Sequence, residues 1–245
     1  HAIPRSGRRF PGKDGIPMNF VVIGASRGLG LCLTSRLLKA GHRVAAGASS
    51  FSAALEALAA SYPEALRVLS ADVTDEAQMA EAAGQAAAFL GEIDALCTVA
   101  GVLLDGDRVK LLHECDVGEL RRTLDVNAVG PVIAAKCFYP YIKKGGRIFT
   151  VTSEGVGVRS CGTWVPCYAL SKAAATKACG ILNASVPDVD FYAVHPGRMN
   201  TDMGRTTAQI EPEVAAEGFC RLMTGETPVS REKWYIDYNG AEMEA

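Results

Sequence analysis

Tyr168 and Lys172 are the two residues whose types and spacing suggest chemistry most directly. They fall within residues 167–185, which show a helical pattern, and residues four apart on a helix share one face. A nearby ammonium favours the phenolate and lowers the pKa of a tyrosine, so Tyr168 could exchange a proton near neutral pH. A carbinol carbon that loses or receives hydride requires such an exchange. The same spacing also occurs by chance on solvated helix faces, so this interpretation needs support from other residues.

A glycine-rich segment gives a second chemical signal. Residues 24–30 read Gly-Ala-Ser-Arg-Gly-Leu-Gly, after a buried-strand run over 20–23 and before a helical pattern over 29–40. Glycines there permit a tight turn and let backbone N–H groups approach a pyrophosphate at a helix N-terminus. This position between a strand and a helix is the context that a dinucleotide-binding loop requires. An ordinary glycine-rich turn is the alternative.

The elements that must position these residues alternate between strands and helices. Short apolar runs predict strands over 20–23, 44–46, 66–69, 93–99, 147–152, 189–194 and 234–237. Helical patterns cover 29–40, 51–61, 75–90, 117–139 and 167–185. We expect Thr74 to cap the third helix and Pro131 to kink the fourth. Strands and helices in this order form a parallel sheet with helices on both faces, so we predict one doubly wound α/β domain over residues 18–245.

The spacing Gly-x-x-x-Gly-x-Gly resembles the short-chain dehydrogenase/reductase family, and the resemblance implies a single-domain Rossmann fold over residues 18–245. The tail, residues 234–240, is similar to the ending of the sniffer-like carbonyl reductases of that family.

The resemblance implies a catalytic set of four residues. Tyr168 would be the acid–base group, and Lys172 would lower its pKa and bind ribose. Ser153 would position the substrate oxygen, and Asn127 would hold a water that relays protons to the lysine. Thr152 is the competitor of Ser153, which could also be a structural serine at a strand end.

The resemblance also assigns the cofactor contacts. Asp72 matches an aspartate that contacts the adenine ring, and Thr201 would bond the nicotinamide carboxamide or a phosphate. Ile23 and Val99 depart from the pattern, since the family has Thr and Asn there; Val99 removes hydrogen bonds that tie the sheet together. The implied cofactor-binding residues are Gly24, Ser26, Arg27, Gly28, Leu29, Gly30, Ser49, Asp72, Val73, Ala100, Gly101, Tyr168, Lys172, Pro196, Gly197, Met199 and Thr201.

The end of the second strand indicates which nicotinamide cofactor binds. An acidic residue there would bond the ribose hydroxyls of NAD and repel a 2′-phosphate. The sequence has no acid at this place, but it has Ser49 and Ser50 there and Arg27 in the glycine loop. We therefore expect NADP(H) to be favoured over NAD(H). A solvated loop charge is the alternative for Arg27.

The substrate is expected to contact residues 154–166 and 202–212, with residues 103–113 as a flexible segment beside the site. The first stretch is apolar, which suits a hydrophobic ketone or aldehyde. Its apolar residues are Val158, Cys161, Trp164 and Val165. Trp164 could equally pack beneath its own loop.

Composition and charge narrow the function classes. The 245 residues include 25 Lys and Arg and 27 Asp and Glu, a net charge of −2 that gives no reason to expect nucleic acid or an anionic membrane as partner. No apolar run is long enough to span a bilayer, and no hydrophobic signal segment opens the sequence. The eight cysteines have neither Cys-x-x-Cys nor zinc-ligand spacing. We therefore expect reduced thiols, no metal and a cytoplasmic protein.

Residues 1–17 are rich in Pro, Gly and Arg and show no apolar period. We interpret them as the remnant of an expression tag. An organelle transit peptide is the alternative, but the Pro and Gly content disfavours the amphipathic helix that such peptides form.

These features together predict an NADP(H)-dependent oxidoreductase that reduces a ketone or aldehyde, or oxidises the corresponding alcohol. Its partner would be a hydrophobic small-molecule carbonyl compound or alcohol, and the oligomeric state stays open, with a homo-oligomer as one option. The alternative is a non-catalytic, cofactor-bound sensor or signalling protein on the same fold.

Overall fold

The computed structural model describes residues 16–157, 161–204 and 208–244. Most of the segment interpreted as a tag remnant (residues 1–15) and the candidate substrate residue Val158 lie outside these described ranges.

The centre of the molecule is a seven-stranded parallel sheet with the strand order β3-β2-β1-β4-β5-β6-β7. The order reverses between β1 and β4, and in such sheets ligands bind beyond the carboxyl ends of the strands at this point. The strands are β1 (Asn19–Ile23), β2 (Arg43–Ala48), β3 (Leu66–Ser70), β4 (Ile93–Thr98), β5 (Ile142–Val151), β6 (Val189–His195) and β7 (Tyr235–Asp237).

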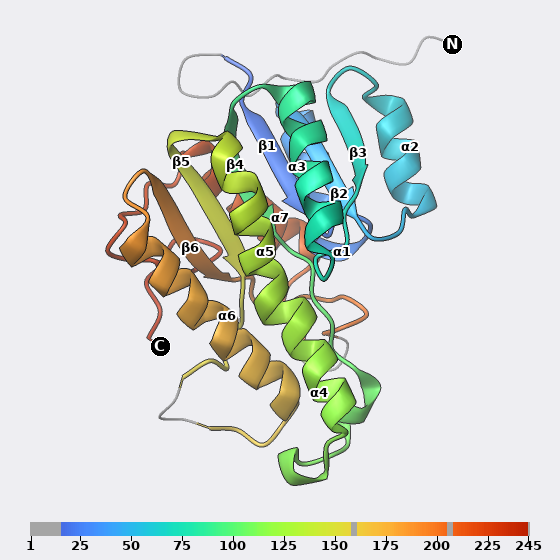
Figure 1. Cartoon of the computed structure of the whole chain (residues 1–245), viewed down its shortest axis with the longest axis vertical. Helices are drawn as coiled ribbons and strands as arrows, with labels where there is room; N and C mark the ends of the chain where they lie inside the picture. Colours follow the sequence, from blue (N-terminus) through green and yellow to red (C-terminus); the bar gives the residue numbers. More distant parts are fainter. Residues whose placement is uncertain (1–15, 158–160, 205–207, 245) are drawn as a thin grey trace.

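Helices cover both faces of the sheet, so the fold is the single, doubly wound α/β domain that the sequence predicts (Figure 1). One face carries α3, α5 and α6, and the other carries α1 and α7. The helices are α1 (Gly28–Lys39), α2 (Ala53–Ser61), α3 (Glu76–Leu90), α4 (Val117–Leu124), α5 (Gly130–Phe138), α6 (Pro166–Ser185) and α7 (Pro212–Thr224). A short 3-10 helix, η1 (Asp105–Arg108), follows β4.

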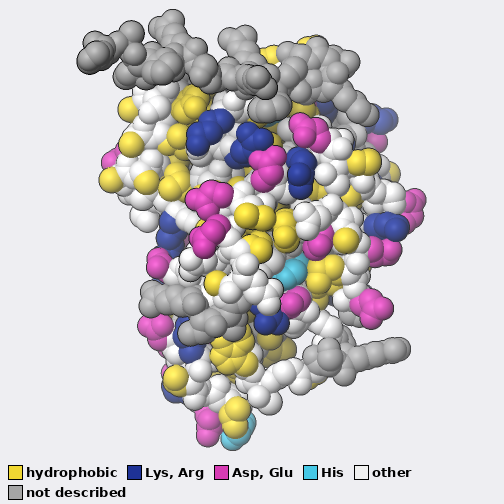
Figure 2. Space-filling model, turned by 180° about the vertical axis from the view of Figure 1, so that it is seen from behind, with side chains coloured by type: hydrophobic (Ala, Val, Ile, Leu, Met, Phe, Trp, Pro, Cys, Tyr) yellow, Lys and Arg dark blue, Asp and Glu magenta, His cyan; other side chains and the backbone are white. Residues whose placement is uncertain are grey.

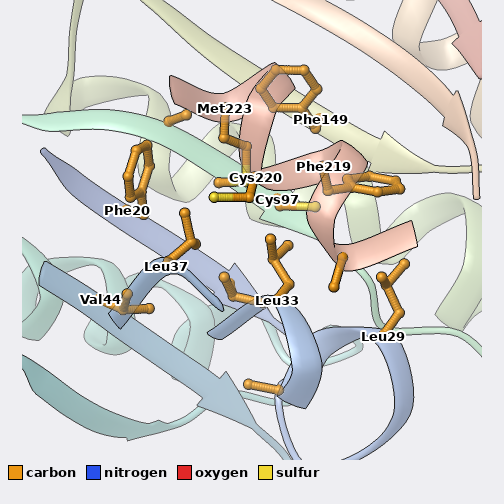
Figure 3. Close-up of a cluster of buried hydrophobic side chains, with 14 of the residues drawn as sticks. Phe20, Leu29, Leu33, Leu37, Val44, Cys97, Phe149, Phe219, Cys220 and Met223 are labelled. Atoms are coloured by element: carbon orange, nitrogen blue, oxygen red, sulfur yellow. The ribbon is translucent and has the colours of Figure 1, made fainter. Parts of the chain in front are cut away.

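The core between the sheet and α1 and α7 is tightly apolar (Figure 3). Phe20, Leu33 and Phe219 are fully buried there. Cys97 and Cys220 are buried in the same cluster, and burial raises the pKa of both thiols, that of Cys220 to about 12. They pack as small hydrophobic side chains. All eight cysteines of the chain are free thiols.

The predicted helix over 117–139 is in fact two helices, and Pro131 is not the cause of the break. A π-helical turn over Asp125–Val129 separates α4 from α5. Pro131 stands in the first turn of α5, where its missing N–H group costs no hydrogen bond. Asn127 lies in the π-turn, and its contacts explain the break, as described below.

Two further expectations are wrong in detail. The cap of α3 is Asp75, whose carboxylate accepts the N–H of Gln78 at 3.0 Å, and not Thr74. Helix α7 was not predicted, although Pro212 begins it and its apolar residues have helical spacing.

No helix in the described ranges is both long and apolar enough to cross a membrane. On the face shown in Figure 2, basic and acidic side chains are interspersed and do not form a continuous patch of one sign.

Candidate active site

A cavity of about 1150 Å³ opens beyond the carboxyl ends of the strands, at the reversal of strand order. It is walled by the loops after β1, β2, β3, β4 and β6, and by residues of α4 and α6. The structure brings together around it these residues predicted from the sequence: Gly24, Ser26, Arg27, Gly28, Leu29, Ser49, Asp72, Val73, Ala100, Gly101, Tyr168, Lys172, Pro196, Met199 and Thr201.

The glycine loop forms one wall, and its geometry requires glycine. Gly24 has φ 94°, and a Cβ atom on it would lie 2.4 Å from the backbone nitrogen of Ala100. A Cβ atom on Gly30 would lie 2.1 Å from the carbonyl oxygen of Gly24. Arg27 precedes α1 without capping it through its side chain. The first N–H groups of α1 therefore have no side-chain cap, and such donors suit the phosphates of a dinucleotide.

Lys172 and Asn127 form the opposite wall, and both are almost fully buried. The Nζ atom of Lys172 donates to the carbonyl oxygen of Val151 at 2.8 Å. Asn127 accepts the N–H of Val102 at 2.7 Å and donates to the carbonyl oxygen of Val102 at 2.8 Å. A Cβ atom on Gly101 would lie 3.2 Å from Oδ1 of Asn127 and 3.4 Å from Nζ of Lys172. The π-turn thus places Asn127 beside the lysine.

Tyr168 and Lys172 lie close together, as their spacing predicts, with Nζ 5.7 Å from the centre of the tyrosine ring. Burial raises the pKa of Tyr168 to about 12 and lowers the pKa of Lys172 to about 8. The expected lowering of the tyrosine pKa by the lysine is therefore wrong for the protein by itself, because desolvation outweighs the ammonium. At pH 7 the tyrosine keeps its proton.

Ser153 follows β5 but lies outside the residues that line the cavity. Its hydroxyl accepts the N–H of Gly155 at 3.3 Å, and its carbonyl oxygen accepts the hydroxyl of Tyr235 at 2.8 Å. Its competitor Thr152 is buried, and the Thr152 hydroxyl bonds to Thr176 on α6. Of the two, Ser153 is the one whose side chain is partly exposed.

At the other end of the cavity, Arg27 is exposed and forms an ion pair with Asp202 at 3.6 Å. Ser49 and Ser50 line the cavity with it. Oδ1 of Asp72 accepts the N–H of Thr74 at 2.9 Å and its hydroxyl at 2.7 Å.

The stretch expected to carry substrate contacts is only partly inward. Trp164 is 51% exposed, whereas Val165 is buried. Residues 103–113, expected to be flexible, include the 3-10 helix η1. In η1 the carboxylate of Asp107 is buried and binds the N–H groups of Cys167 and Tyr168, a role that the sequence did not predict. No residue near Asp107 in the sequence signals this contact, because its partners are 60 residues away.

Among the residues that the structure places, no group of three or more His, Cys, Asp or Glu side chains is arranged to hold a metal ion.

Comparison with known proteins identifies the family. The sequence model of the family described as short chain dehydrogenase matches residues 19–211. The 1-deoxy-11-beta-hydroxypentalenate dehydrogenase of Streptomyces avermitilis is 32% identical over 223 residues, which cover 89% of this chain and 78% of that protein. The short chain dehydrogenase tazN of Aspergillus terreus is 33% identical over 193 residues, or 74% of this chain. The match covers only 41% of the length of tazN.

Solved structures show the same fold. The carbonyl reductase Sniffer of D. melanogaster matches with a TM-score of 0.83 at 19% identity, covering 94% of this chain and 100% of that one. A short-chain dehydrogenase/reductase of Burkholderia multivorans with bound NADP matches with a TM-score of 0.81 at 23% identity, also covering 94% and 100%. The family model covers well over half of the sequence, and the S. avermitilis relative agrees with it. The chain therefore belongs to the short-chain dehydrogenase/reductase family of oxidoreductases.

Proposed function

We propose that the protein is an NADP(H)-dependent oxidoreductase that reduces a hydrophobic ketone or aldehyde, or oxidises the corresponding alcohol. The observation that carries the proposal is the cavity itself. One of its walls is a glycine loop at a helix N-terminus, and the other presents Tyr168 beside a buried lysine.

The residues around the cavity fit a nicotinamide dinucleotide. A Cβ atom on Gly24 or Gly30 would collide with backbone, so the chain keeps this loop free of side chains where phosphates would approach. Asp72 and Val73 would lie toward the adenine, and Pro196, Gly197, Met199 and Thr201 toward the nicotinamide. When bound, the cofactor supplies or accepts the hydride.

Tyr168 would provide the proton. A tyrosine with a pKa near 12 is protonated at neutral pH, so it can give a proton to a carbonyl oxygen as that oxygen gains charge. The Lys172 ammonium, 5.7 Å from the ring, would stabilise the phenolate left behind. Asn127 would hold the water that returns a proton toward Lys172. Ser153 would hold the substrate oxygen once its hydroxyl turns from Gly155 toward the cavity.

The preference for NADP(H) rests on the end of β2. Strand β2 ends at Ala48 and continues into Ser49 and Ser50, so no carboxylate would repel a 2′-phosphate. Arg27 lines the same end of the cavity and could pair with that phosphate. Because its guanidinium is 75% exposed and already paired with Asp202, we propose a mild preference. The B. multivorans protein, which has the same fold, binds NADP.

The test is a turnover assay with NADPH and a panel of aromatic and aliphatic ketones and aldehydes. The proposal expects NADPH oxidation with at least one hydrophobic member of the panel. Tight NADPH binding without turnover of any of them would contradict the proposal and favour the sensor.

A further inference from the structure

The first turn of α6 has no cap of its own. Val165, the residue before the helix, has φ 47°, and its side chain has no atom that can accept a hydrogen bond. Pro166 begins the helix and has no N–H group. The first N–H groups that need a partner are therefore those of Cys167 and Tyr168.

A distant carboxylate takes both of these N–H groups. Asp107 in η1 is only 5% exposed. Its Oδ1 accepts the N–H of Cys167 at 2.8 Å, and its Oδ2 accepts the N–H of Tyr168 at 2.8 Å. Charge-assisted bonds of this length in a buried place are strong and directional, so they fix the Tyr168 backbone nitrogen relative to η1.

The other end of the same residue is held from the same stretch of chain. Ser171 donates its hydroxyl to the carbonyl oxygen of Tyr168 at 2.7 Å. The Ser171 hydroxyl in turn accepts Nδ2 of Asn127 at 3.0 Å, and Asn127 is bonded to Val102. Both ends of the Tyr168 backbone are therefore tied to the segment 102–108 that follows β4.

Segment 102–108 also reaches the wall of the cavity after β6. The Arg108 guanidinium donates to the carbonyl oxygen of Met203 at 2.8 Å, and Met203 lines the cavity. Asp107 itself is not among the lining residues. It therefore touches neither a bound substrate nor a cofactor in that cavity.

We propose that Asp107 is a positioning residue, which sets the place of the Tyr168 hydroxyl through the first turn of α6. This inference rests on the proposed function, because Asp107 acts through Tyr168. Small displacements of a reacting group lower the rate far more than they lower ground-state binding. Loss of Asp107 should therefore reduce kcat and leave KM and NADPH affinity nearly unchanged.

The experiment compares four variants with the wild type, using NADPH and the carbonyl compound that the wild type reduces fastest in the panel. Asp107→Asn keeps one acceptor but turns an NH2 group toward a backbone N–H, and Asp107→Ala loses both bonds. Asp75→Ala is the matched control, because Asp75 caps α3 through a single bond to Gln78 away from the cavity. Tyr168→Phe reports on the proposed function itself.

We expect kcat to fall roughly tenfold in Asp107→Asn and roughly a hundredfold in Asp107→Ala. KM and the NADPH dissociation constant should stay within about twofold in both, as expected for a residue outside the cavity. Asp75→Ala should lower the melting temperature without lowering kcat. If Asp107→Ala does not fold, the decrease in Asp107→Asn carries the test.

Two results would overturn the inference alone. One is full kcat in the folded Asp107 variants while Tyr168→Phe is inactive. The other is a loss of kcat in Asp75→Ala as large as that in the Asp107 variants. An active Tyr168→Phe, or a wild type that reduces no member of the panel, would overturn the proposed function, and the inference with it.

Discussion

Replacing Lys172 by methionine should reveal the energetic cost of burying this ammonium. The side chain is 2% exposed, and burial lowers its pKa from the ordinary 10.5 to about 8. Each unit of pKa corresponds to 1.36 kcal/mol, so the shift corresponds to about 3 kcal/mol of folding free energy at neutral pH. Methionine has a similar length and no charge to bury.

The sign of the pH dependence follows from where the proton is bound. Between about pH 8 and pH 10.5 the unfolded chain keeps the lysine proton and the folded chain loses it. The wild type therefore becomes more stable relative to Lys172→Met as pH rises through this window, by about 3 kcal/mol in total. Below about pH 8 the difference between the two proteins should be constant.

Urea unfolding of both proteins without cofactor, at intervals from pH 7 to pH 10, measures this difference. Buried cysteines such as Cys97 and Cys179 also titrate differently in the two states, but they are present in both proteins and cancel in the subtraction. Lys177→Met, on the exposed side of α6, is the matched control and should show no such trend. A wild-type minus Lys172→Met difference that is flat or falls with pH would refute the reasoning.

Further substitutions test other parts of the account. Tyr168→Phe should lower kcat by about 10²–10⁴-fold with NADPH affinity nearly unchanged; near-normal turnover would remove Tyr168 from the acid–base role. Arg27→Ala should weaken NADPH by about 1 kcal/mol, roughly fivefold in Kd, and NADH by less; equal losses in titrations of both cofactors would count against the NADP(H) preference. Gly30→Ala should destabilise the protein by about 2 kcal/mol or more, because its Cβ atom would meet a backbone oxygen. Gly84→Ala in α3 has open space and should stabilise by about 0.5–1 kcal/mol; urea unfolding that gives both glycine variants the same sign would contradict this packing.

Local signals explain why the sheet and the glycine loop could be predicted. The strands are short apolar runs because both faces of the sheet are covered. The loop over residues 24–30 requires glycine for reasons set within a few residues, as the contact between Gly30 and Gly24 shows. Tyr168 and Lys172 could be paired because helix geometry fixes their spacing.

The features that escaped prediction depend on contacts between distant residues. The π-turn at Asn127 is accompanied by bonds to Val102 and Ser171, 25 and 44 residues away. Asp107 caps a helix that begins 59 positions later in the sequence, and no pattern near it signals the contact. The raised pKa of Tyr168 results from burial, whereas the spacing of Tyr168 and Lys172 reports only the neighbouring charge.

The transfer of deuterium from NADPH to the substrate tests the central claim most directly. The protein would be incubated with NADPH that carries deuterium at the transferred position of the nicotinamide, together with the panel of ketones and aldehydes. Mass spectrometry of the products should find deuterium on the carbinol carbon with the wild type and not with Tyr168→Phe. NADPH binding without deuterium in any alcohol product would contradict the account.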